Sequence, residues 1–236
     1  MALSAATVWE VRTTGLATNG GGFVAGTGTD YSQQNDAHAN LEGISCDGSS
    51  TILTSNPFFF SAAMVGNFIY LVGGGATEGF YEIVTFNSTT SATLDRTPGA
   101  IVAGTGKVGG AQSSPVLVIA AMPDATATAA NVVHIKAGTY TVGGSVIPGG
   151  AGHWLHHHRI SGYNTIRGDA TAPCVTWDAN NGDFHVYAPL KTCIRLEYIT
   201  VNGNAAGACT RLKHGFYCTI GGSAATFYRC RTTNTG

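Results

Sequence analysis

Residues 193–201 read Cys-Ile-Arg-Leu-Glu-Tyr-Ile-Thr-Val, a run dominated by β-branched and apolar residues, and an Asn-Gly-Asn turn follows at 202–204. A run of this kind that ends at an Asn-Gly turn is typical of a β-strand. Three further runs in the second half of the chain have the same character, at 132–135, 156–160 and 227–230. Short strands that recur between turns predict a solenoid of stacked β-coils.

The spacing of two positions supports this prediction. Ile199 and Cys230 lie 31 positions apart, and an Asn-containing turn follows each of them, at Asn202 and Asn234. Asn suits a coil corner because its side chain bonds its own backbone and tolerates the left-handed conformation. A coil cannot bury both of its ends, so we expect another subunit, or more of the natural chain, to cover the last one.

The composition predicts an all-β fold. Only 11% of the 236 residues are Asp, Glu, Lys or Arg, and 33 are Gly. Exposed faces of helices are usually rich in charged residues, and this chain has few of them, whereas Gly and small polar residues suit tight turns. The chain is long enough to bury a substantial core as one large β domain or two modest ones.

Charge and hydropathy exclude several classes of partner. The net charge is −1 with scattered signs, so the sequence lacks the basic surface of a nucleic-acid-binding protein. No stretch is apolar enough over sufficient length to insert in a membrane. Residues 1–6 lack the basic start of a secretory leader, a combination that fits assembly in a host cytoplasm and release by lysis.

The cysteines are widely separated and have no zinc-site spacing. Small apolar Cys side chains can fill the core of stacked coils, so we favour packing over disulfides or metal. The six are Cys46, Cys174, Cys193, Cys209, Cys218 and Cys230.

Residues 1–110 are predicted to form a separate N-terminal β domain. A short strand at 8–12 precedes a Gly-rich stretch at 19–32 that predicts irregular backbone, a turn or short helix at 30–34, and a strand at 51–54. Runs at 68–72, 79–86 and 91–95 then predict a three-stranded meander, entered through a tight turn at 64–67. Together with the early strands it could close a small barrel or a sandwich.

The boundary to the second domain, residues 111–236, is placed in the Gly- and Ala-rich segment 98–111, which we interpret as a connector. Ser114 and Pro115 then have the pattern of a helix start, which predicts a helix at 114–122 that caps the solenoid. A buried strand is the alternative, because Val and Ile favour strands.

Several segments, taken in order, resemble a group of phage and metagenomic virion proteins with a pectate-lyase-like right-handed β-helix. They are Asn-Gly-Gly-Gly-Phe at 19–23, Gly-Thr-Asp-Tyr-Ser-Gln-Gln at 28–34, Met-Val-Gly-Asn at 64–67, Thr-Leu-Asp-Arg at 93–96 and Val-His-Ile-Lys-Ala-Gly-Thr-Tyr-Thr at 133–141. The segments Ile-Ser-Gly-Tyr at 160–163 and Arg-Gly-Asp at 167–169 look like the following rung. The resemblance implies an all-β chain in which the N-terminal domain precedes the start of a right-handed parallel β-helix. It also implies a location in the virion, as a fibre, spike or head appendage.

Residues 153–158 read His-Trp-Leu-His-His-His. Imidazoles are transition-metal ligands, but in a strand His156 and His158 share one face while His157 points to the other. Three neighbours therefore cannot converge on one ion unless symmetry brings copies together. We favour an exposed strand or loop, and we predict no metal, no cofactor and no catalytic residue.

Polysaccharide cleavage is the enzymatic alternative. Hydrolysis needs two carboxylates about 5 to 9.5 Å apart, and a lyase needs a base with a cation or metal. We interpret the charges of the second half as surface and turn residues, with Glu197 outward on its strand and Asp178 and Asp183 around an Asn-Asn-Gly turn. The candidates are Asp169, Asp178, Asp183 and Glu197, with Arg167, Arg195, Lys191 and Lys213.

Aromatic residues of the second half could stack on sugar faces if several lined one side, although core packing is their commoner role. They are Trp154, Trp177, Tyr187, Tyr198, Phe216, Tyr217 and Tyr228.

The sequence thus predicts a virion structural protein that mediates assembly or host attachment. Its expected partners are copies of itself, other virion proteins and a host surface glycan. A glycan-degrading tailspike enzyme is the second hypothesis, and a secreted bacterial adhesin is the third.

Overall fold

The structure is a computed structural model that describes residues 3–57, 59–143, 146, 149–180, 193–203 and 225–233. It is all-β, as the composition predicts. The chain divides into a first unit, Met1–Glu10 with Thr14–Gln112, and a second unit, Val11–Thr13 with Ser113–Gly236.

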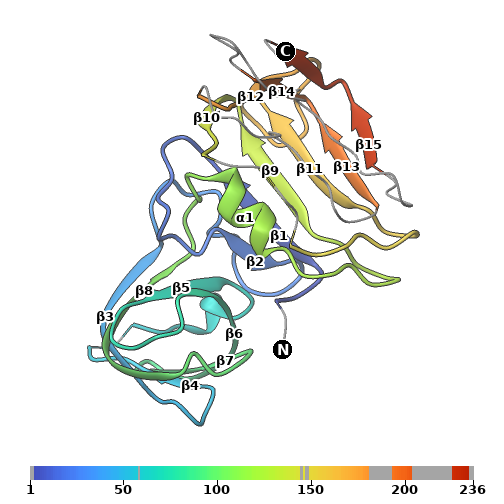
Figure 1. Cartoon of the computed structure of the whole chain (residues 1–236). Helices are drawn as coiled ribbons and strands as arrows, with labels where there is room; N and C mark the ends of the chain where they lie inside the picture. The colour runs from blue at the N-terminus through green and yellow to red at the C-terminus, as the bar shows by residue number, and fades with distance from the viewer. Residues whose placement is uncertain are drawn as a thin grey trace. The chain divides into compact units, whose positions relative to one another are not determined.

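The first unit contains a closed barrel with the strand order β3-β4-β7-β6-β5-β8 (Figure 1). The predicted meander is confirmed, because β5, β6 and β7 pair antiparallel in sequence order. Closure leaves the barrel without an open sheet edge. Its elements are β3 (Ala39–Asp47), β4 (Ile52–Thr54), the 3-10 helix η1 (Ala62–Met64), β5 (Phe68–Val72), β6 (Gly79–Ser88), β7 (Ser91–Leu94) and β8 (Ala100–Val108).

The interpretation of residues 98–111 as a connector is wrong. This segment contains β8, which pairs with both β3 and β5 and so closes the barrel. Its glycines make room for the core: a Cβ on Gly104 would lie 2.6 Å from Ile101 Cγ2, and one on Gly106 would lie 2.8 Å from Ile69 Cδ1. Between the buried residues Ile101 and Val108, the inward positions of β8 are therefore Gly, which hides the hydrophobic alternation and makes the sequence resemble a loop.

The barrel core is one cluster of mostly apolar side chains. The hydroxyl group of Tyr81, which lies in this cluster on β6, is hydrogen-bonded. Tyr81 Oη donates to the carbonyl oxygen of Thr77 at 2.6 Å. The largest fully buried members are Tyr81, Leu41, Ile44, Leu53, Ile69, Leu71 and Ile83.

A short antiparallel pair, β1 (Thr7–Val11) and β2 (Gly22–Val24), begins the chain. Trp9 of β1 is fully buried, with its ring centroid 5.2 Å from that of Phe68 and 5.3 Å from that of Phe80. The stretch 19–32, which was predicted to be irregular, therefore contains a three-residue strand. The turn predicted at 64–67 is present, and the Asn67 N–H donates to Met64 O at 2.9 Å.

Residues 115–121 form a helix, α1 (Pro115–Ala121), and not the alternative strand. Ser114 is extended and Pro115 takes the first helical turn, where its missing N–H is not needed. Val118 and Ile119 are buried. In the part of the chain that the structure describes, no helix has the length and apolarity needed to cross a membrane.

The second unit is built from strands that alternate between two parallel sheets, ordered β9-β11-β13-β15 and β10-β12-β14-β16 (Figure 1). We call two consecutive strands, one from each sheet, a circuit. Ile160 pairs with Val133 and Leu196, and Leu196 pairs with Phe227, so matched apolar positions stack from circuit to circuit. The strands are β9 (Val132–Lys136), β10 (Gly138–Thr141), β11 (His158–Tyr163), β12 (Val175–Asp178), β13 (Ile194–Glu197), β14 (Ile199–Asn202), β15 (Ala225–Tyr228) and β16 (Arg231–Thr233).

Two of the predicted strands are each divided by a corner. The run 193–201 breaks at Tyr198 (φ 60°), and the run 227–230 breaks at Arg229 (φ 49°), where the chain passes from one sheet to the other. The 31-residue spacing is confirmed by the pairs Ile194 with Ala225 and Thr200 with Arg231. Asn234 lies outside the described residues.

Candidate functional site

A buried carboxylate flanked by two arginines is the main charged cluster of the second unit. Glu197 is 2% exposed, and its two oxygens bind different side chains. Arg159 Nε lies 2.5 Å from Glu197 Oε2, and Arg195 Nε lies 2.6 Å from Glu197 Oε1. Both arginine side chains are 45% exposed. One buried anion therefore holds two cations at the surface.

Strand alternation places these residues on one face of the sheet. In β13, Ile194 and Leu196 are buried among the stacked apolar positions, so Arg195 and Glu197 point to the opposite face. Arg159 of β11 pairs in register with Arg195 of β13. The two arginines therefore lie side by side on neighbouring strands, whose backbones are about 4.8 Å apart. Glu197 is outward-facing, as predicted, but it is buried by its partners and does not form part of an open surface.

Aromatic rings extend the cluster across the next circuit. Tyr228 of β15 pairs with Glu197 and is 38% exposed. The Arg195 guanidinium lies 5.5 Å from the centre of the Tyr228 ring, and that of Arg229 lies 5.3 Å from it. The Tyr198 ring meets the Tyr228 ring edge-on at 5.6 Å. We call Arg159, Arg195, Glu197 and Tyr228 the Arg-Tyr face.

Sequence reasoning identified Glu197, Arg195 and Tyr228 separately and missed Arg159. The signal for Arg159 was its place before Ile160 in an alternating strand, which puts it on the polar face. Its pairing with Arg195 could not be inferred, because the circuits contain loops of different lengths.

The other predicted carboxylates hold turns together. Asp178 accepts a hydrogen bond from the Asn180 N–H at 2.9 Å, and Asp169 accepts three from its own loop. Asp178 is the last residue of β12 and its carboxylate holds the turn that follows, while Asp169 holds its own loop; the structure does not pair either with Glu197. Asp183, Lys191 and Lys213 lie outside the described residues, while Arg167 lies in the loop that Asp169 organises.

The carboxylate of Asp169 should keep the loop at 164–166 ordered. It accepts the N–H groups of Asn164 (2.7 Å), Thr165 (2.7 Å) and Ile166 (3.0 Å), and these bonds lower its pKa. Since the ionised form is favoured, the loop should stay ordered at mildly acidic pH. Asp169→Ala should accelerate hydrogen exchange of the amides of 164–166, measured by NMR or mass spectrometry. Asp178→Ala is the matched control, and equal exchange in both variants would contradict this role.

The histidine-rich segment is a turn followed by a buried residue. His153 and His156 exchange two backbone hydrogen bonds of 2.9 Å, and Trp154 and Leu155 at the tip are 73% and 54% exposed. The strand predicted at 156–160 begins only at His158, and His156 and His157 are exposed ahead of it, as the exposed-loop interpretation predicts. His158 is fully buried, its Nδ1 accepts the Asn131 N–H, and burial lowers its pKa.

Cysteines and metal ligands form no cluster in the described part of the chain. Cys46 and Cys193 are buried free thiols, Cys174 and Cys230 are partly buried free thiols, and burial raises the pKa of Cys174 and Cys230. Among the residues described, no group of three or more His, Cys, Asp or Glu could hold a metal ion. Cys209 and Cys218 lie outside these residues.

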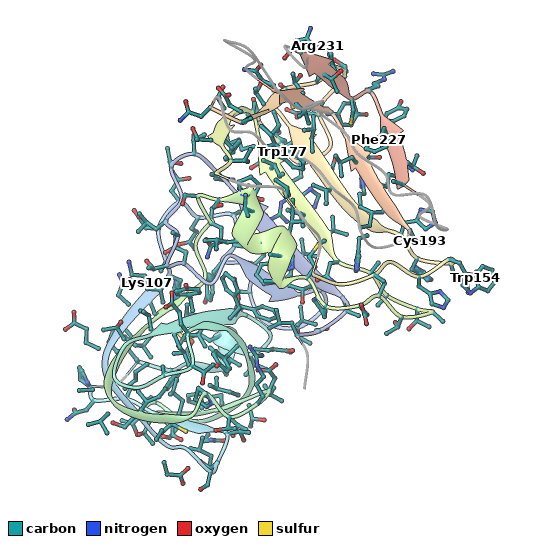
Figure 2. The ribbon with its side chains drawn as sticks, in the orientation of Figure 1. Lys107, Trp154, Trp177, Cys193, Phe227 and Arg231 are labelled. Atoms are coloured by element: carbon teal, nitrogen blue, oxygen red, sulfur yellow. The ribbon has the colours of Figure 1, made fainter. Side chains whose placement is uncertain are left out.

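The predicted aromatic residues divide between core and surface. Trp177 is fully buried, whereas Trp154 projects from the tip of its turn (Figure 2). Tyr198 and Tyr228 belong to the polar side of the second unit and contact each other. Tyr187, Phe216 and Tyr217 lie outside the described residues.

A second charged cluster, which sequence reasoning missed, lies in the barrel. The Glu82 N–H donates to Asp95 Oδ1 at 3.1 Å, and Arg96 binds Asp95 at 2.7 Å. Burial, and then the charge of Asp95, raises the pKa of Glu82 to about 7. Glu82 therefore exchanges its proton close to neutral pH.

Glu82 should make the stability of the barrel depend on pH. Because its pKa in the folded chain is raised from 4.5 to about 7, the folded chain keeps a proton that the unfolded chain has released. The free energy of unfolding should therefore fall as the pH rises through this window. Glu82→Gln should remove the fall and gain about 1 kcal/mol at pH 8 but not at pH 4, measured by urea denaturation. Exposed Glu42→Gln is the control, and an unchanged pH profile for Glu82→Gln would contradict the assignment.

Two hollows of about 330 and 380 Å³ lie on the barrel surface. Asp47 lines the first, but its Oδ1 already accepts the N–H groups of Ser49 and Ser50. The first is lined by Ser45, Cys46, Asp47, Ser50, Ile52 and Thr54, and the second by Asn40, Leu41, Glu42, Thr105, Gly106 and Lys107.

No protein-family model matches the chain, and neither the search of curated proteins nor that of solved structures finds a match. The function therefore has to be argued from the residues. On that basis the Arg-Tyr face suits binding better than acid-base catalysis, because Glu197 is neutralised on both oxygens and the other described candidate carboxylates are engaged in turns.

Proposed function

We propose that this protein is a structural and adhesive component of a phage particle, as a fibre, spike or head appendage. In this proposal the circuits of the second unit are the first coils of a right-handed parallel β-helix, and the barrel unit docks onto the particle. The observation that carries the proposal is the alternation of strands between two parallel sheets in matched register. Stacked circuits give a stiff, extendable body whose outer faces can be used for attachment.

Assembly into a symmetric oligomer is part of the proposal. Phe227 of β15 pairs with Leu196 of β13 and so continues the same apolar stack. Leu196 is 1% exposed, whereas Phe227 is 37% exposed. An apolar side chain at a stacking position is suited to burial against a second copy, and closed symmetry also protects strand edges from uncontrolled pairing.

Sedimentation of the whole chain over a range of concentrations tests assembly. The expected result is one oligomer of fixed size, seen as a regular particle by electron microscopy. A monomer at all concentrations would count against the assembly that we propose. The handedness of the coils can be read from a crystal structure, in which left-handed crossovers would exclude the proposed fold.

A glycan-degrading tailspike enzyme is the second candidate, favoured only by the presence of Glu197 and two arginines on one sheet face. It predicts reducing ends or unsaturated sugars after incubation with bacterial surface polysaccharide. The adhesive proposal predicts polysaccharide of unchanged length. Product that disappears in Glu197→Gln would replace our proposal with the enzymatic one.

A further inference from the structure

The two arginines of the Arg-Tyr face retain most of their hydrogen-bonding capacity. Each guanidinium carries five N–H donors, and the two ion pairs with Glu197 use the Nε groups. The terminal amino groups of two half-exposed side chains on neighbouring strands remain outside these pairs. Such paired guanidinium forks match the geometry of carboxylate and sulfate oxygens.

The buried glutamate positions the arginines and leaves a net positive charge. Two cations and one anion sum to +1, and Glu197 is 2% exposed, so a solvent-borne anion would meet the guanidinium groups rather than the carboxylate. Because the ion pairs already fix both long side chains, little conformational freedom remains to be lost when a ligand binds.

An aromatic ring stands beside the charges. Tyr228 is 38% exposed, lies on the strand next to Arg195, and is held between Arg195, Arg229 and Tyr198. An exposed ring has an apolar face for the C–H groups of a sugar and a hydroxyl group that can reach water or a ligand. In an acidic saccharide, the guanidinium pair can thus bind the carboxylate or sulfate group, and the neighbouring ring can pack against the sugar.

We infer that the Arg-Tyr face binds an acidic polysaccharide, with Arg159 and Arg195 on its carboxylate or sulfate groups and Tyr228 against a sugar ring. This inference rests on the proposed adhesive function and names its ligand class. A nucleic acid fits less well, because the chain carries only 12 Lys and Arg and a net charge of −1.

Binding of the full chain to three polymers tests the inference. Hyaluronate supplies carboxylates, dextran sulfate supplies sulfates, and neutral dextran is the control. We expect binding to at least one acidic polymer, weakened by salt, and none to dextran. Arg159→Gln and Arg195→Gln should each weaken it at least tenfold, and Tyr228→Ser severalfold, whereas Arg167→Gln should not change it. Circular dichroism and a thermal melt check that each variant folds.

Four results would overturn the inference: no binding to either acidic polymer, equal binding of neutral dextran, wild-type affinity in both arginine variants, or equal affinity for double-stranded DNA. Failure of the proposed function is recognised separately. A chain that forms its oligomer but binds neither acidic polymer refutes the ligand and leaves the structural role standing. A chain that binds but stays monomeric, or that shortens the polymer, refutes the proposed role and keeps the binding face.

Discussion

Replacing Trp177 with Ala is expected to lower the free energy of unfolding by about 3–5 kcal/mol. Trp177 lies on β12, is fully buried, and pairs in register with Tyr140 and Val201, which are buried too. Removing the indole ring from a stack of matched apolar positions leaves a cavity that parallel strands on both sides cannot collapse to fill.

The chain supplies a matched control, because Trp154→Ala removes the same ring from a site that is 73% exposed. Its effect should stay within about 0.5 kcal/mol. Urea denaturation followed by circular dichroism measures both variants. Similar losses for the two variants would mean that Trp177 does not support the core of the second unit.

Replacing Glu197 with Ala should cost about 2–4 kcal/mol. The two ion pairs would be lost, and Arg159 and Arg195 would face each other as like charges on neighbouring strands, which is itself destabilising. The estimate lies below that for a fully buried pair because both guanidinium groups reach water.

Denaturation at low and high salt measures this effect. Exposed Glu42→Ala is the control and should change the free energy of unfolding by less than about 0.5 kcal/mol. Salt should reduce the loss only slightly, because the carboxylate is shielded from screening ions. A loss no larger than that of the control would show that Glu197 does not organise the Arg-Tyr face.

The elements that the sequence predicted well are those in which local pattern and final structure agree. The strands β5 and β6 of the meander are rich in apolar, β-branched and aromatic residues, and Gly and Asn turns separate the three strands β5, β6 and β7. The strand β8 was missed because two of its four buried positions are Gly104 and Gly106, so that only Ile101 and Val108 carry an apolar side chain on that face. The corners at Tyr198 and Arg229 were missed because a single left-handed residue other than glycine has no compositional signature.

The candidate site depended on information that local sequence does not contain. Alternation along 194–197 predicts that Arg195 and Glu197 share a face, and this is correct. Arg159 joins them only because β11 pairs with β13 in a particular register. This register cannot be read from the sequence, because the stretches between paired strands differ in length from one circuit to the next. The burial of Glu197 is a consequence of that register.

The unequal stretches between paired strands have a consequence for variation. Val175 pairs with Ile199 after a short excursion of the chain, whereas Gly138 reaches its partner Val175 only after a long one, and both pairs keep the same sheet in register. The ladder therefore tolerates insertions wherever the chain leaves it. New surface segments grafted or exchanged at these points should leave the stacked interior unchanged.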